Sequence, residues 1–163
     1  MFLIKEMTCG EFHSTVYDVK LGDKATYNRY YEIIVTSTNQ KLKIGLQECF
    51  FGIEPQIELT KENVLIGAGK NFYIVNLINK NFFRIELDAP LYWFFVEDNT
   101  IVIVDEIDVI CLNCRGIIIW KKEFDGIITK DELENGVLKI EIDDGRHVEL
   151  DVSTGKEKEL VLE

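Results

Sequence analysis

The stretch His147-Val-Glu-Leu-Asp-Val-Ser-Thr-Gly-Lys156 decides the fold, because its pattern occurs twice more, earlier in the chain. An apolar run ends in Asp or Asn, and a short polar turn follows it. The same pattern occurs at Ile74-Val-Asn-Leu-Ile-Asn-Lys-Asn81 and at Cys111-Leu-Asn-Cys-Arg-Gly116. Similarity at a fixed spacing indicates internal repeats, which have to be recognised before single motifs are interpreted.

The spacing of these copies is nearly constant. Asn76 and Asn113 are 37 positions apart, and Asn113 and Asp151 are 38 positions apart. The strands that precede them keep the same step, as three isoleucines 37 positions apart show: Ile66, Ile103 and Ile140. Two independent markers therefore agree on a repeat of about 37 residues.

Each repeat contains four short apolar runs, rich in β-branched and aromatic residues and separated by Gly, Asn and Asp, which is typical of strands and turns. The runs of the first repeat are 56–59, 64–66, 72–75 and 82–87. Those of the second are 93–96, 101–104, 109–112 and 117–120, and those of the third are 126–129, 137–142, 147–150 and, more weakly, 159–162. Asn135-Gly136 and Asp144-Gly145 are hairpin signals. The sequence predicts an all-β fold built from antiparallel four-stranded, blade-like repeats.

Four strands in 37 residues is the size of a propeller blade. The stretch from His147 to Lys156 resembles the turn of quinoprotein-like repeats, and Trp120 lies where such repeats often carry a closing Trp. The repeats also resemble WD-type blades, although they lack the Trp-Asp and Gly-His dipeptides. The resemblance covers about residues 55 to 163 and implies a small or incomplete β-propeller. It implies almost nothing about function.

Residues 1–54 fit the repeat less well, although 15–21, 31–35 and 41–46 also have the composition of strands. They are predicted to form either a degenerate fourth blade or a cap over an exposed blade edge. We find no linker or domain boundary, so 1–163 is predicted to be a single domain, with 55–163 as three repeats. An open arc of blades leaves a sheet face that a homodimer could cover.

Composition narrows the class of function. The chain has 163 residues and a net charge of −11, which disfavours nucleic-acid binding and is compatible with a basic protein partner. Simple solubility would explain the same charge. There is no apolar run long enough to span a membrane, and Lys5 and Glu6 interrupt the apolar start, so we expect a cytoplasmic protein with reduced thiols.

Cys111 and Cys114 have the spacing of a metal knuckle or a redox pair. The turn that contains them exists without cysteine in the other two copies, which favours a core cysteine followed by a turn cysteine. Structural zinc needs four ligands, and only Cys9, Cys49 and the two histidines remain. A redox pair lacks the helix N-terminus that lowers a thiol pKa. The sequence excludes neither a zinc site nor a redox pair, but we predict no metal site and no cofactor.

Catalytic motifs are also lacking. Two histidines give little scope for a triad, and the Gly67-Ala-Gly69 stretch leads into a strand, unlike a phosphate-binding loop. We therefore predict that the chain is not an enzyme. Blade geometry instead places many acidic residues in loops on one face, and the predicted partner-binding residues are Asp105, Glu106, Asp108, Asp125, Asp143 and Asp144. The alternative is that turns collect Asp for backbone reasons alone.

The leading interpretation is a non-catalytic module that binds a basic protein through this acidic face. A small acidic protein without catalytic residues is similar in profile to bacterial immunity proteins, which inhibit a cognate toxin, often a basic nuclease. An oligomeric scaffold that uses an apolar surface is the alternative, although the run Leu91-Tyr-Trp-Phe-Phe95 reads as a core strand. A small-ligand site at the centre of the propeller ranks last.

Overall fold

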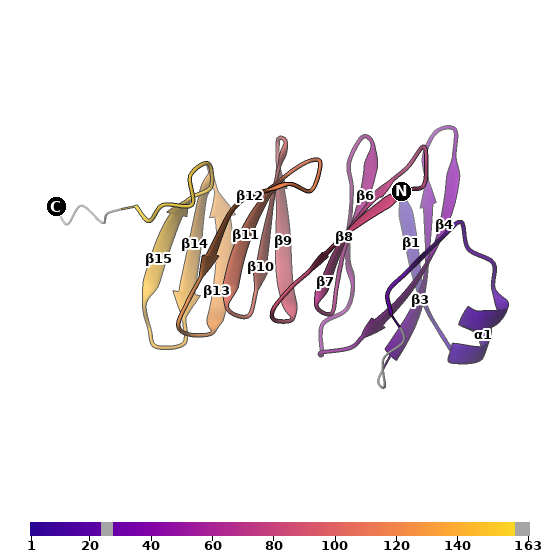
Figure 1. Cartoon of the computed structure of the whole chain (residues 1–163), viewed down its shortest axis with the longest axis horizontal. Coiled ribbons are helices and arrows are strands. Elements are labelled where there is room, and N and C mark those ends of the chain that lie inside the picture. Colours follow the sequence, from indigo (N-terminus) through magenta and orange to yellow (C-terminus); the bar gives the residue numbers. More distant parts are fainter. Residues whose placement is uncertain (24–27, 159–163) are drawn as a thin grey trace. The chain divides into compact units, whose positions relative to one another are not determined.

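The computed structural model describes residues 1–23 and 28–158, which form β-strands and one short helix (Figure 1). The predicted all-β class is confirmed. The chain divides into two compact units, Met1–Glu86 and Leu87–Glu163, which we describe separately. In the described ranges no helix is long and apolar enough to cross a membrane. The cellular location and the single domain stay predictions.

The first unit contains two four-stranded sheets. Its strands are β1 (Phe2–Met7), β2 (Val19–Leu21), β3 (Asn28–Thr36), β4 (Lys41–Cys49), β5 (Gln56–Leu59), β6 (Asn63–Ala68), β7 (Asn71–Asn76) and β8 (Phe82–Glu86). The second sheet, β5-β6-β7-β8, is the predicted meander of the first repeat. The first sheet has the order β1-β3-β4-β2, and β2 pairs with β4 in parallel. Residues 1–54 therefore match a blade in the number of strands but not in their order.

The helix α1 (Cys9–Ser14) and strand β1 were not expected from the sequence. A capping box starts the helix, because Thr8 Oγ1 accepts a hydrogen bond from Glu11 N at 3.2 Å and Glu11 Oε2 accepts one from Thr8 N at 2.9 Å. The helix residue Phe12 is fully buried against Tyr17 and Tyr30. The Tyr17 ring in turn covers Gly45 on β4, where any side chain would collide with it. This aromatic group covers one face of the first sheet. Whether residues 1–54 act as a degenerate blade or as a cap stays a prediction.

The second unit contains the other two repeats. Its strands are β9 (Leu91–Glu97), β10 (Thr100–Asp105), β11 (Asp108–Asn113), β12 (Ile118–Glu123), β13 (Ile128–Glu134), β14 (Val137–Ile142) and β15 (His147–Asp151). They form a sheet of order β12-β11-β10-β9 and a sheet of order β13-β14-β15. The weak fourth run of the last repeat, 159–162, lies outside the described residues. Within the described part, Leu150 and Glu157 form an isolated antiparallel bridge at the free side of β15.

A separate apolar core holds each unit together. In the first unit, Ile33 and Ile44 of the first sheet pack with Val64 and Tyr73 of the second. In the second unit, Val102 and Val109 belong to the same cluster as Leu138 and Leu150. In the run Leu91–Phe95, Leu91 and Phe94 are buried as expected, whereas the Trp93 side chain is 49% exposed.

The repeat marker identified in the sequence has a local explanation. Asn76 Oδ1 accepts hydrogen bonds from the backbone N–H groups of Ile78 and Asn79, both at 3.0 Å. Asn113 Oδ1 accepts from Arg115 N at 2.9 Å and from Ile117 N at 3.0 Å, and Asp151 Oδ1 accepts from Ser153 N at 2.8 Å. Each marker residue therefore closes the turn that follows its strand, as short polar side chains often do. The Asn135-Gly136 hairpin is also present, with φ of 51° and 73° at its two turn residues.

Candidate functional site

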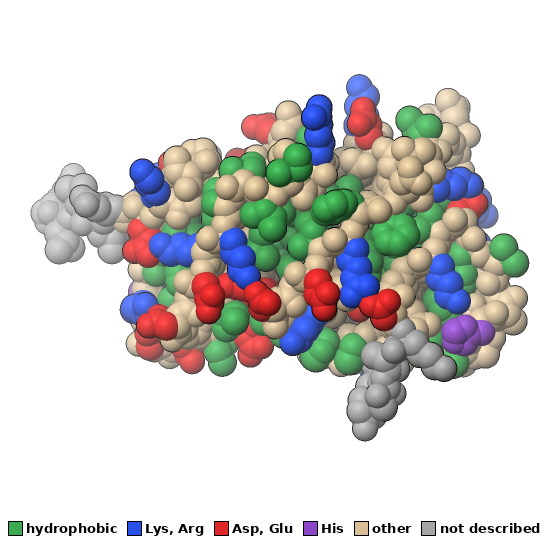
Figure 2. All heavy atoms as spheres, viewed as in Figure 1, with side chains coloured by type: hydrophobic (Ala, Val, Ile, Leu, Met, Phe, Trp, Pro, Cys, Tyr) green, Lys and Arg blue, Asp and Glu red, His purple; other side chains and the backbone are tan. Residues whose placement is uncertain are grey.

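The six predicted partner-binding residues lie at one end of the second unit, in connections that are hydrogen-bonded to one another. Phe124 N donates to the Ile107 carbonyl at 2.9 Å, which joins the β12–β13 connection to the β10–β11 turn. Ile127 N donates to Asp143 Oδ1 at 3.1 Å, which joins the same connection to the β14–β15 turn. Figure 2 shows acidic side chains along the lower edge of this part of the chain. The placement agrees with the loop geometry predicted for blades.

Two of the six residues are buried and cannot themselves contact a partner. Asp105 is 0% exposed, and its Oδ1 accepts hydrogen bonds from Ile107 N at 2.9 Å and Asp108 N at 2.7 Å. Its other carboxylate oxygen, Oδ2, is buried without a hydrogen-bond partner among the described residues. Burial raises the pKa of Asp105 to about 6, although the two backbone donors act in the opposite direction. Asp105 is thus a turn-forming residue. Its carboxylate accepts hydrogen bonds from the backbone of its own turn, which is the alternative reason for finding Asp in such turns.

Asp108 begins β11 and is also buried. Its Oδ2 lies 2.9 Å from Lys121 Nζ, and the same ammonium group pairs with the exposed Asp88. The hydrogen-bonded Asp88 and the ion-paired Asp108 raise the pKa of Lys121, so the ammonium stays charged between the two carboxylates. This arrangement supplies a buried carboxylate with the cation that it needs.

The other four predicted residues reach the surface. Asp125, Asp143 and Asp144 are exposed and Glu106 is half-buried, and we call these four the acidic loop edge. Arg146 pairs with Asp125 and Asp144 across this edge. In the described part of the chain, no ion pair involves Glu106 or Asp143. The acidic loop edge has four carboxylates, and Arg146 pairs with two of them, so the edge keeps an excess of negative charge. That it binds a partner stays a prediction.

The cysteine pair is separated by its own turn. Cys111 is fully buried in the second core, where its Sγ lies 3.7 Å from the Val152 carbonyl and burial raises the pKa of its thiol to about 11. Cys114 is exposed in the turn that Asn113 closes. In the described residues no three His, Cys, Asp or Glu side chains come together as a metal site would require. Cys111 is therefore a core residue, and Cys114 is a turn residue.

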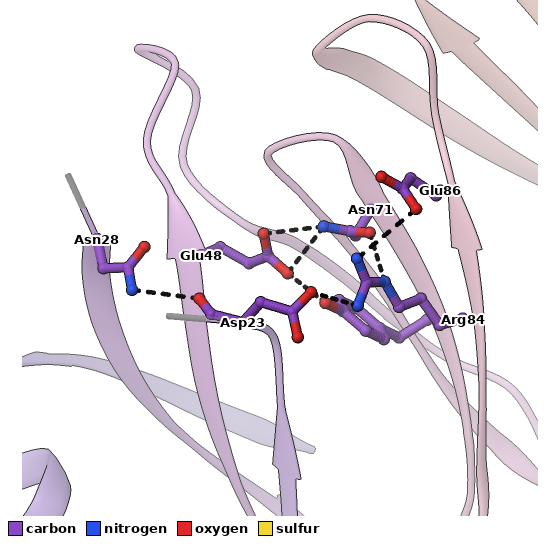
Figure 3. Close-up of polar contacts among 7 residues, drawn as sticks. Asp23, Asn28, Glu48, Asn71, Arg84 and Glu86 are labelled. Atoms are coloured by element: carbon purple, nitrogen blue, oxygen red, sulfur yellow. Dashed lines mark hydrogen bonds and ion pairs between the residues drawn. The ribbon is translucent and has the colours of Figure 1, made fainter. Parts of the chain in front are cut away.

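A second polar cluster, in the first unit, was missed by the sequence reasoning (Figure 3). The buried Glu48 carboxylate accepts hydrogen bonds from Asn71 Nδ2 at 3.0 and 3.1 Å and from the Tyr73 hydroxyl. Asn71 Oδ1 accepts from Arg84 Nε at 2.8 Å, and Arg84 forms an ion pair with Asp23. Burial raises the pKa of Glu48, while its donors act to lower it.

This buried cluster is closed on two sides by backbone. A side-chain carbon at Gly22 or Gly69 would lie 3.2 Å from a Glu48 oxygen and still closer to main-chain atoms of β4, and both glycines have positive φ. Both oxygens of Glu48 already have donors. The cluster therefore ties β4 of the first sheet to β7 and β8 of the second, and we assign it a structural role.

The two buried clusters occupy the same place in successive repeats. Asn71 and Asp108 are 37 positions apart and each begins the third strand of its sheet. Arg84 and Lys121 are also 37 positions apart, and in their sheets they lie opposite Tyr73 and Ile110, two residues further along the same strands. A polar residue at the start of strand three and a cation on strand four are thus a second marker of the repeat. The 37-residue spacing could have revealed it.

One hollow of the second unit is an open, charged sheet face. It has a volume of about 480 Å³ and lies on the β13–β15 sheet. Its charges largely pair across the strands, as between Lys130 and Glu141 at 2.7 Å, while Lys139 pairs with Glu134 at 2.9 Å. Asp131 and His147 also line this hollow.

Comparison with known proteins supports the fold alone. A scan of protein-family models gives no match, and a search of curated proteins gives none either. Solved structures do match, and these neighbours are β-propeller or WD-like proteins of low sequence identity. The matches give no support to the resemblance to immunity proteins.

Three of these neighbours show the extent of the similarity. BamB from Moraxella catarrhalis has a TM-score of 0.55 at 9% identity, with 87% of this chain and 52% of BamB covered. BBS1N, solved in complex with ARL6DN, gives 0.53 at 9% identity, with 85% and 48% covered. The N-terminal domain of Nup159 gives 0.51 at 15% identity, with 78% and 40% covered. The chain spans about half the length of these propellers, and it resembles them in its antiparallel, mostly four-stranded sheets.

Proposed function

We propose that the chain is a non-catalytic protein-interaction module that docks a basic protein surface on its acidic loop edge. The observation that carries the proposal is the convergence of three hydrogen-bonded connections that present Glu106, Asp125, Asp143 and Asp144, of which Arg146 pairs with Asp125 and Asp144. Carboxylates that are gathered and held by backbone hydrogen bonds focus an electrostatic field, which accelerates and orients association with a positive partner.

Two further features support this class of function. Polar side chains that could have formed a catalytic site, such as Glu48 and Asp108, are instead engaged in buried contacts. A propeller-type neighbour, BBS1N, was solved in complex with ARL6DN, which illustrates how such a fold is used in that protein. An immunity-type inhibitor would be one member of the proposed class.

Neutralising the acidic loop edge is expected to abolish capture of basic proteins. The test variant carries Glu106→Gln, Asp125→Asn and Asp143→Asn, and the amide oxygen introduced at position 143 can still accept from Ile127 N. Immobilised wild type should retain a small set of basic proteins from a lysate at roughly 0.05 M salt and release them at roughly 0.3 M, because screening shortens the range of the field. The variant should retain about one tenth of the amount of basic protein that the wild type retains, or less, as measured by quantitative mass spectrometry.

A matched control separates a local site from net charge. Glu62→Gln, Asp98→Asn and Glu132→Gln remove the same amount of charge from exposed positions elsewhere. This control should capture as much as the wild type. Equal capture by all three proteins would show that the acidic loop edge has no special role, and the proposal would fail.

A further inference from the structure

Three side chains with metal-binding atoms border Tyr30 on the face of the first sheet that helix α1 covers (Figure 1). Met7 ends β1 and lies opposite Tyr30 in the β1–β3 register, so both side chains point to the same face. Cys9 begins helix α1, and its hydrogen bond with the Tyr30 hydroxyl raises the pKa of Tyr30. The His13 ring lies edge-on to the Tyr30 ring, with 5.7 Å between the two centroids. A thioether, a thiol and an imidazole are therefore gathered around one tyrosine.

The helix makes Cys9 and His13 a chelating pair. Residues four positions apart are neighbours on a helix surface, with about 5–6 Å between their Cβ atoms. The same spacing allows two histidines of one helix to bind a single metal ion. Although α1 has only 6 residues, the capping box of Thr8 and Glu11 fixes its first turn, and the fully buried Phe12 anchors it on the sheet. The pair is thus held in place by the fold.

The donor atoms of this cluster are accessible. Cys9 and His13 are exposed, Met7 is half-buried, and Cys9 is a free thiol. Within residues 1–23 and 28–158, the His13 ring has aromatic neighbours but no hydrogen bond or ion pair. Met7 Sδ accepts one hydrogen bond, from the Tyr17 hydroxyl at 3.3 Å, and its second lone pair stays available. An ion from solvent could therefore be bound without opening the core.

The chemistry of these donors selects the kind of ion. Thiolate and thioether sulfur are soft ligands, and among biological metals they favour monovalent copper, which needs only two or three ligands. A zinc-type group of three or more His, Cys, Asp or Glu side chains is not found in the described residues. The carboxylate of the helix, Glu11, is occupied by the capping box, since it accepts from Thr8 N and Thr8 Oγ1, both at 2.9 Å.

We propose that Cys9 and His13 bind one monovalent copper ion, with Met7 as a weaker third ligand. On binding, the Cys9 S–H bond breaks, a bond from Sγ to copper forms, and the proton is released to solvent, while the copper keeps its oxidation state. His13 binds through a neutral ring nitrogen. The Tyr30 hydroxyl is a positioning group that donates a hydrogen bond to the sulfur ligand. This site shares no residue with the acidic loop edge, so the two proposals can fail independently.

Titration with monovalent copper tests the site. Under reducing, oxygen-free conditions, the protein competes for copper with the coloured chelator bicinchoninate, and the loss of colour gives stoichiometry and affinity. The wild type should take up one copper per chain. Cys9→Ser should raise the dissociation constant by about 100-fold or more and His13→Ala by about tenfold or more, because each removes a ligand. Met7→Leu keeps the size of the side chain and should raise it by about threefold.

Matched controls distinguish this site from copper binding by any free thiol. Cys114→Ser and His147→Ala remove an exposed cysteine and an exposed histidine elsewhere, and both should bind copper like the wild type. Far-UV circular dichroism would verify that each variant is folded. X-ray absorption of the bound copper should show both nitrogen and sulfur neighbours.

Three results would overturn the copper site. The first is a loss of affinity in Cys114→Ser as large as in Cys9→Ser. The second is an unchanged affinity in His13→Ala, with only sulfur around the metal. The third is a copper ion shared by two chains, which native mass spectrometry would detect as a copper-dependent dimer.

Discussion

Replacing Glu48 by alanine is expected to lower the free energy of unfolding by about 3–5 kcal/mol. The substitution leaves the buried Tyr73 hydroxyl and the buried Asn71 amide N–H without their acceptor. Asn71 keeps the hydrogen bond from Arg84 but loses the one that joins it to β4. Buried donors without an acceptor lose their hydrogen bonds to water and form none with the protein, which costs free energy. Denaturant unfolding followed by far-UV circular dichroism would measure the loss.

The Glu48→Gln variant tests the reason for this effect. A glutamine keeps one acceptor for Tyr73 but turns an amide N–H towards Asn71 Nδ2, which is also a donor. Asn71 cannot flip without losing the hydrogen bond from Arg84 to its Oδ1, so we expect a smaller loss of about 1–2 kcal/mol. Glu86→Ala removes only an exposed carboxylate 3.9 Å from Arg84 and should change stability little. A loss for Glu48→Ala no greater than for Glu86→Ala would contradict the structural role.

Local chemistry explains how much of the fold was predictable from the sequence. Asn76, Asn113 and Asp151 each accept hydrogen bonds from the backbone of their own turn, so the repeat is determined within a few residues and its strands could be placed. Helix α1 was missed because it is only 6 residues long, too short for a periodic pattern. Its signal was the capping box of Thr8 and Glu11.

The candidate site was predictable in position but not in exposure. Alternation of loops between two faces correctly brought Asp105, Asp125 and Asp143 to one end of the second unit. The same reasoning treated Asp105 and Asp108 as surface charges. They belong to strands that are buried along almost their whole length, and this distinguishes them from Asp143 and Asp144.

The Glu48 cluster could not be predicted in the same way. Glu48 and Asn71 are 23 positions apart and come from different sheets, so their contact depends on how the two sheets pack. Only the equivalence of Asn71 and Asp108, and of Arg84 and Lys121, was accessible from the 37-residue spacing. Tertiary contacts between different repeats leave no such signal in a single sequence.

Replacing Asp105 by asparagine is expected to stabilise the protein at pH 7.5 by roughly 1–3 kcal/mol. The asparagine oxygen can still accept from Ile107 N and Asp108 N, so the turn is kept. The buried charge disappears, and an amide N–H group takes the place of the oxygen that has no hydrogen-bond partner among the described residues. The nearby Asp108 carboxylate, which raises the pKa of Asp105 by repulsion, would then face a neutral donor.

The pH dependence of this effect has a definite sign. The pKa of Asp105 is about 6 in the folded protein against 3.8 ordinarily, so the folded state holds the proton more tightly than the unfolded state. The contribution of Asp105 to stability is fully present below pH 3.8 and is lost as the pH rises to about 6. By this linkage the loss amounts to roughly 3 kcal/mol at most, and the Asp105→Asn variant should lack it.

Fluorescence makes the measurement specific to the second unit, since Trp93 and Trp120 both lie there. Denaturant unfolding followed by tryptophan emission at pH 4.5 and pH 7.5 should show a larger advantage of Asp105→Asn at the higher pH. Asp144→Asn is the matched control, because that carboxylate is exposed and hydrogen bonds from Arg146 lower its pKa. It should give no stabilisation at pH 7.5. If Asp105→Asn instead destabilises the protein equally at both pH values, the ionised carboxylate is needed to close the turn, and its two backbone hydrogen bonds outweigh the cost of burying the charge.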